Sequence, residues 1–76
     1  MSRYTVALNN YYQSRQRTHL VSWVEFSSGP PHALSWTTTC KVAGETVSTA
    51  TDNHKAAAKE KAAQIACEKL GINVST

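Results

Sequence analysis

The sequence lacks most of the features that mark an enzyme or a metal protein. Its two cysteines, Cys40 and Cys67, form no CxxC pair, and no spacing between them and His32 or His54 is typical of zinc ligands. A Gly-x-Ser-x-Gly motif is missing, and the five acidic residues suggest no catalytic pair of carboxylates. We therefore expect a protein without catalytic activity, metal or cofactor, in which both cysteines are buried as small apolar side chains.

Long apolar runs are also missing. No stretch of eighteen apolar residues could span a membrane, and the N-terminal residues do not form an apolar signal segment. Two cysteines are few for a disulfide-rich secreted protein, which favours an intracellular location. The 76 residues allow a single domain, residues 1–76, and eight Lys and Arg against five Asp and Glu give a net charge of +3. This mild excess permits a polyanionic partner without requiring one.

Hydrophobic periodicity predicts two helices that enclose three strands. The first helix is expected at residues 3–15 with Ser2 as its cap, and the last at residues 54–70, capped by Asp52 or Asn53 and ended by Gly71. Strands are expected at residues 19–27, 34–42 and 45–50. The order favours an α+β fold, α-β-β-β-α, in which both helices pack on one face of a three-stranded antiparallel sheet.

The same periodicity predicts the buried side chains of each element. On the first helix and the middle strand they are Tyr4, Leu8, Tyr11 and Tyr12, then Trp36, Thr38, Cys40 and Val42. On the last helix they are Ala58, Ala62, Ala63, Ala66, Cys67 and Leu70. Trp23, Trp36 and Phe26 could alternatively stack on the bases of a single strand. We expect Trp36 in the core and leave Trp23 open.

Three segments together resemble the double-stranded-RNA-binding domain family. The first, LNNYYQ at residues 8–13, is similar to the family's first-helix pattern of Leu, Asn, Glu, two variable residues and Gln. The second, GPPHALSW at residues 29–36, matches the Gly-Pro-Pro-His loop that precedes an aromatic residue, and the third, KAAAKEKAAQIACEKL at residues 55–70, resembles the last helix. The resemblance covers roughly residues 4–71 and implies a domain that binds double-stranded RNA by its A-form shape.

The resemblance also implies where the RNA would be contacted. A-form RNA exposes 2′-hydroxyls in a wide, shallow minor groove and hides its bases in a deep major groove. In this family the first helix and the loop between the first two strands contact minor grooves, and the start of the last helix binds phosphates. The residues at these positions are Thr5, Asn9, Asn10, Gln13, Pro31, His32, His54, Lys55 and Lys59.

The sequence departs from the family pattern at several contact positions. Asn10 stands where the family usually has Glu, Val6 where a polar or sulfur-bearing residue is common, and Ala56 where it has a second lysine. Lys61 lies about 200° round the helix from Lys59 and is expected to miss the groove. These departures predict modest affinity, supplemented by a partner domain or a dimer.

A second function fits the same fold. Members of the family that have lost RNA contacts dimerise or dock a protein through the third strand and the last helix. The expected third strand (ETVSTA) has little charge and forms an unshielded sheet edge, which favours pairing with another chain. Retention of His32, Lys55 and Lys59 favours RNA binding over this alternative.

Overall fold

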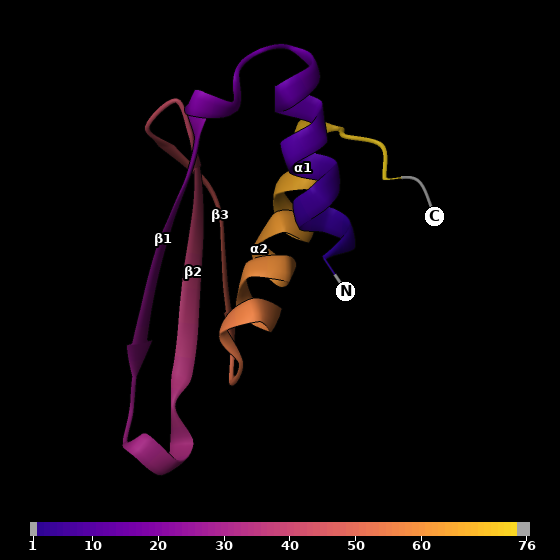
Figure 1. Ribbon diagram of the computed structural model, residues 1–76. Helices are drawn as coiled ribbons and strands as arrows, with labels where there is room; N and C mark the ends of the chain where they lie inside the picture. Colours follow the sequence, from indigo (N-terminus) through magenta and orange to yellow (C-terminus); the bar gives the residue numbers. More distant parts are fainter. Residues whose placement is uncertain (1, 75–76) are drawn as a thin grey trace.

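The computed structural model describes residues 2–74 and confirms the predicted order of elements (Figure 1). The helices and strands are α1 (Arg3–Ser14), β1 (Val21–Ser28), β2 (Ser35–Val42), β3 (Glu45–Asp52) and α2 (Lys55–Leu70). Short 3₁₀ turns occupy Thr18–Leu20 and Pro31–Ala33. Neither helix in this part of the chain has the length and apolarity needed to cross a membrane.

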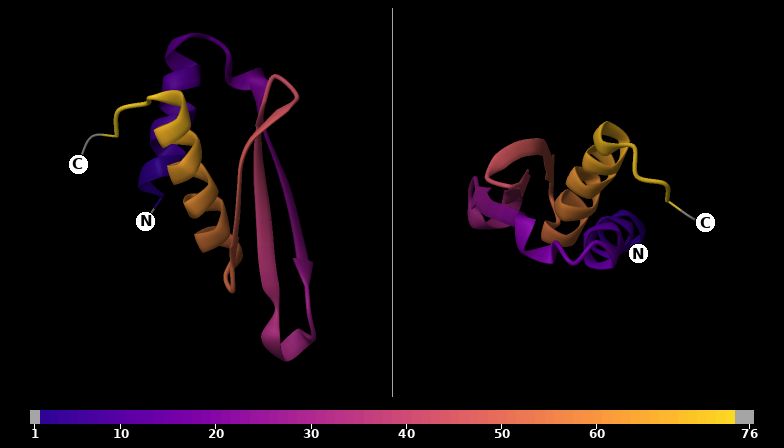
Figure 2. Two further views of the ribbon diagram at one scale, coloured as in Figure 1. Left: turned by 180° about the vertical axis from the view of Figure 1, so that it is seen from behind. Right: turned by 90° about the horizontal axis from the view of Figure 1, so that it is seen from above.

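The three strands form one antiparallel sheet in the order β1-β2-β3. Both helices lie on the same face of this sheet, as predicted; α2 packs directly on β2 and β3, and α1 packs against α2 (Figures 1 and 2). Ala43 and Gly44 connect β2 to β3 with positive φ angles of 54° and 81°. Two left-handed residues are characteristic of the tight turns whose twist suits a β-hairpin.

Some predicted boundaries were wrong by one or two residues. β1 begins at Val21 rather than residue 19 because the preceding chain is wound into a 3₁₀ turn, closed by a hydrogen bond from the Leu20 N–H to the Arg17 carbonyl (3.0 Å). β2 begins at Ser35, one residue later than predicted. β3 continues to Asp52 because its last residues pair with Trp36 and Thr37.

The predicted helix caps were also wrong in detail. Ser2 and His54 occupy the N-cap positions of α1 and α2, and neither side chain makes a capping hydrogen bond. The Asp52 carboxylate instead accepts the His54 N–H (3.0 Å). α1 ends at Ser14, and Gln16, with φ 56°, turns the chain away from the helix axis.

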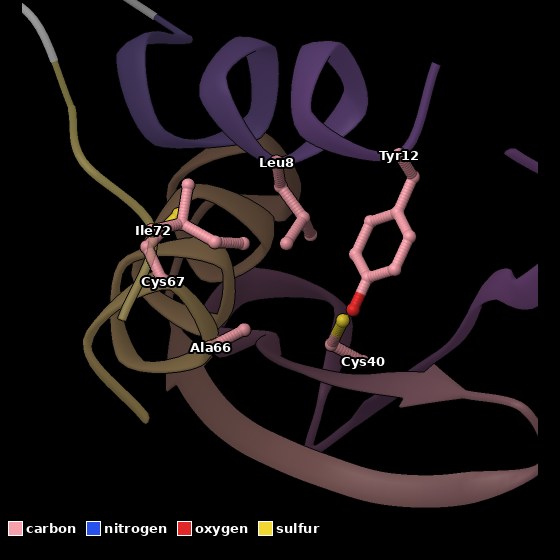
Figure 3. Packing of buried hydrophobic residues seen from close by; sticks show 6 residues of the cluster. All are labelled: Leu8, Tyr12, Cys40, Ala66, Cys67 and Ile72. Atoms are coloured by element: carbon pink, nitrogen blue, oxygen red, sulfur yellow. The ribbon is translucent and has the colours of Figure 1, made fainter. Parts of the chain in front are cut away.

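The core is built from α1, α2 and the middle strand (Figure 3). Its buried members are Leu8, Tyr12, Cys40, Ala66, Cys67 and Ile72. Ala58, Ala62 and Ala63 are also fully buried, so the small face of α2 approaches the sheet closely. The Ser48 hydroxyl donates to the Ala62 carbonyl (2.6 Å), which ties β3 to the middle of α2.

Two expected core residues lie elsewhere. Leu70 is 37% exposed, and Ile72, at 8%, packs into the core in its place. Gly71 reverses the chain with φ 69°, and the Ile72 N–H then donates to the Cys67 carbonyl (2.9 Å), which turns the isoleucine inward. Trp36 is only half-buried and outside the core cluster, whereas Trp23 packs against it.

Candidate nucleic-acid interface

The first surface is the outer side of α1. Asn9, Asn10 and Gln13 are exposed, and no hydrogen bond within residues 2–74 uses their side chains. Thr5 differs because it is half-buried and its hydroxyl donates to Glu60 on α2 (2.8 Å). Thr5, Asn9 and Gln13 follow one another at four-residue spacing and so share one edge of the helix. We call these three residues the α1 row.

Asn10 lies apart from the α1 row. It lines a hollow of about 640 Å³ between α1 and residues 72–74, together with Val6 and Tyr11. Val6, the other departure from the family pattern, is 51% exposed. The amide of Asn10, beside this exposed valine, can both donate and accept hydrogen bonds.

The second surface is the loop between β1 and β2, at the lower end of the sheet in Figure 1. Gly29 opens the loop with φ 95°, and a Cβ there would lie 2.8 Å from the Ala33 carbonyl oxygen, so only glycine fits. The Pro30 carbonyl accepts the Ala33 N–H (2.9 Å), which closes a turn around Pro31 and His32. The imidazole of His32 is thereby exposed on a stiff turn.

The third surface is formed by the first two turns of α2. The Lys55 ammonium lies 5.3 Å from the ring centroid of Trp36, and the Lys59 ammonium 5.0 Å from that of Trp23. Both distances fall within the range of a cation–π attraction. The two indoles stand on adjacent strands, on the face of the sheet that the helices cover. The two ammoniums therefore lie near indoles of the sheet, although Lys55 is exposed and Lys59 half-buried.

Trp36 connects the second and third surfaces. It lines a hollow of about 450 Å³ with Pro31 and His32 from the loop and Asn53 from the chain before α2. The same ring lies beneath the Lys55 ammonium. Loop and lysines are thus neighbours, and α1 contributes a separate surface farther along the molecule, whose longest extent is 41 Å (Figures 1 and 2).

The other cations near α2 are arranged differently. Lys61 pairs with Asp52 (2.6 Å), and this hydrogen bond, together with the His54 N–H, holds the pKa of Asp52 below its usual range. Lys61 therefore faces the end of β3, and His54 is exposed beside it at the helix start. Ala56 is exposed and supplies no charge. Lys55, by contrast, lies over Trp36, which lines the hollow beside the loop.

The β3 edge is less open than the sequence suggested. A register shift between Cys40 and Lys41 leaves Val47 as an extra residue in β3, and the Lys69 ammonium donates to its carbonyl (3.0 Å). Bulges and lysines both hinder the pairing of a sheet edge with another chain. The expectation of an unshielded edge was wrong at this point.

The cysteines form no metal site with their neighbours. Both are free and buried, and within residues 2–74 no three His, Cys, Asp or Glu side chains are placed to hold an ion. Burial, followed by the proximity of Cys67, raises the pKa of Cys40 to about 11. These thiols are protonated core residues at neutral pH.

Comparison with known proteins identifies one family. The model described as double-stranded RNA binding motif matches residues 7–70, from the middle of α1 to the end of α2. The match includes most of the α1 row, the whole loop and both lysines. No curated protein matches the sequence.

Sequence reasoning missed the partners of the two lysines and of Thr5. The four-residue spacing of Lys55 and Lys59 is plain in the sequence, but the tryptophan rings beneath them lie on strands more than fifteen residues away. The role of Glu60 could not be predicted from the sequence, because a glutamate on a lysine-rich helix normally faces solvent.

Proposed function

The chain belongs to the double-stranded RNA binding motif family, and on that premise we propose that it grips an A-form duplex by shape, through 2′-hydroxyl and phosphate contacts at the three surfaces. Membership makes double-stranded RNA the partner, and the family is one of binding domains rather than enzymes. One such domain spans about sixteen base pairs, over two minor grooves and the intervening phosphates.

The observation that carries the proposal is the position of Trp36 between the loop and Lys55. A minor-groove contact and a phosphate contact must be held at a fixed separation if the domain is to measure the shape of a duplex. Here one half-buried ring lies beneath the Lys55 ammonium and lines the same hollow as Pro31 and His32, so packing within the sheet sets the separation rather than a flexible linker.

Each surface has chemistry that suits its place on the duplex. The His32 imidazole can donate to a 2′-hydroxyl or to an acceptor on a base edge, and Pro31 limits the entropy lost when the loop is ordered. Lys55 and Lys59 supply the phosphate contacts, assisted by His54 at the start of α2. Asn9, Asn10 and Gln13 offer amides, and Thr5 a hydroxyl that can accept while it donates to Glu60.

A titration tests the proposal. A labelled 20-base-pair RNA duplex, a DNA duplex of the same sequence and one RNA strand alone are titrated with the protein at two salt concentrations, and anisotropy reports binding. We expect the RNA duplex to bind most tightly, with little dependence on its sequence, because DNA lacks both the A-form groove and the 2′-hydroxyl.

Two outcomes of the same titration would contradict the proposal. Equal affinity for DNA would mean that charge alone holds the complex. No duplex binding at low salt, together with a concentration-dependent dimer, would support protein docking instead, although the Lys69 contact on β3 does not favour that reading.

A further inference from the structure

The N-terminus of α1 is capped by a residue of α2. The Glu60 carboxylate accepts the N–H of Tyr4 (2.5 Å), the N–H of Thr5 (3.1 Å) and the hydroxyl of Thr5 (2.8 Å). The first N–H groups of a helix have no partner within it, and a local side chain usually satisfies them. Ser2 stands at the local position without such a bond. Glu60, 55 positions beyond Thr5 in the sequence, has taken that role.

This contact is between a charged group and the positive end of a helix. Burial opposes ionisation of Glu60, but the hydrogen bonds from Tyr4 and Thr5 outweigh it and hold the pKa of the carboxyl below its usual range. The group is therefore ionised at neutral pH, where the α1 dipole also favours a negative charge.

Glu60 directly follows Lys59, and successive side chains on a helix point about 100° apart. One turn of α2 thus places Lys59 over Trp23 and Glu60 against the start of α1. Thr5, which Glu60 holds twice, is the first residue of the α1 row. The phosphate contact and the α1 contact are joined through two consecutive residues.

We propose that Glu60 is a positioning residue for duplex binding: by capping α1 it sets where Asn9 and Gln13 lie relative to Lys59. This inference rests on the proposed function. Leu8 and Tyr12 hold α1 in the core independently, so loss of Glu60 leaves the helix docked. It removes the contact that fixes the N-terminal end of α1, so the helix can tilt about its core contact. The α1 row then meets the minor groove in a range of orientations.

Electrostatics and positioning predict opposite changes in duplex affinity when Glu60 is replaced, so the test can distinguish them. Removing an acidic residue from an RNA-binding domain should strengthen binding by electrostatics alone. Loss of positioning should weaken it. We expect Glu60→Ala to weaken duplex binding about fivefold, the equivalent of one ordinary hydrogen bond. Glu60→Gln, which keeps an acceptor oxygen, should lose less.

Ser48→Ala is the matched control. It removes a buried hydrogen bond between β3 and α2 and does not touch α1, so it lowers stability without moving the α1 row. All variants are compared at a temperature where circular dichroism shows them folded. Ser48→Ala should bind the RNA duplex like the wild type. Should Glu60→Ala not fold, Glu60→Gln alone decides between weaker and stronger binding.

A double-mutant cycle links Glu60 to α1. In an Asn9→Ala, Gln13→Ala background the contacts that Glu60 positions are gone, so Glu60→Ala should cause no further loss of affinity. Additive losses, or unchanged or tighter binding by the Glu60 variants, would overturn the role of Glu60 and leave duplex binding intact. A wild-type protein without preference for duplex RNA would overturn the proposed function itself.

Discussion

Replacing Lys55 and Lys59 with alanine should change the salt dependence of RNA binding by a predictable amount. Each lysine that neutralises a phosphate contributes about 0.9 to the slope of log affinity against log salt on a duplex. Two lysines therefore contribute about 1.8. Between 50 and 200 mM salt the wild type should lose about twelvefold more affinity than the double variant, since a fourfold rise in salt costs about 3.5-fold per contact.

The rings beneath the lysines make the slope a better measure than affinity alone. Moving an ammonium off Trp36 or Trp23 to reach a phosphate costs about 0.5–1 kcal/mol at an exposed site, which reduces the net gain from each contact. The slope counts released ions and is insensitive to this cost. The assay is the anisotropy titration of the 20-base-pair RNA duplex at several salt concentrations between these limits.

Lys61→Ala provides the control, because it removes the same charge from the same helix. Lys61 is paired with Asp52 at the end of β3, so its loss should leave the slope nearly unchanged. Equal decreases in slope for Lys61→Ala and for Lys55→Ala or Lys59→Ala would refute the geometry, since binding would then depend on total charge. An unchanged slope in the double variant would refute the phosphate contacts themselves.

Two further predictions concern the loop and the core. Gly29→Ala should lower the free energy of unfolding by about 1–3 kcal/mol and weaken duplex binding, because the left-handed backbone and the Ala33 carbonyl leave no room for a methyl group. Urea unfolding measures the stability and anisotropy measures the binding, with Ser28→Ala as the control. Wild-type stability and affinity for Gly29→Ala would contradict the strained turn. Cys40 should resist iodoacetamide at pH 8 until the protein unfolds, because its native pKa is raised from 9.0 to about 11. The neutral thiol favours the folded state fully below pH 9, and this contribution is lost as the pH rises toward 11. Rapid labelling of the folded protein would contradict this.

The element order could be predicted because each element carries its own periodicity. Leu8 and Tyr12 mark one face of α1, and the alternation from Thr38 to Cys40 marks the buried face of β2. Gly71 was correctly placed as the end of α2. What the pattern could not show was the direction of the chain beyond it: Leu70 continues the apolar spacing, but the left-handed turn carries Ile72 into the core instead.

The candidate contacts were predicted as residues but not as an arrangement. Lys55 and Lys59 were expected from the resemblance to the family's last helix, whereas their placement over Trp36 and Trp23 depends on the packing of α2 on the sheet. Trp36 was expected in the core because apolar and polar residues alternate along its strand. Trp36 lies near the start of β2, where it lines the loop hollow instead. The Glu60 cap joins segments 55 residues apart, and local reasoning has no access to such pairs.

The same packing bears on the lysine that Ala56 replaces. A lysine side chain that is fixed on binding loses up to about 2 kcal/mol of rotamer entropy. Trp36 and Trp23 already restrain Lys55 and Lys59, so an ammonium that binds a phosphate while it stays over its ring has lost part of that entropy on folding rather than on binding RNA. Two pre-ordered cations can therefore offset some of the affinity that a third, flexible one would supply. The salt slope would still count only these two lysines, so we expect the affinity of this domain for RNA to depend more on its fixed shape than on its charge.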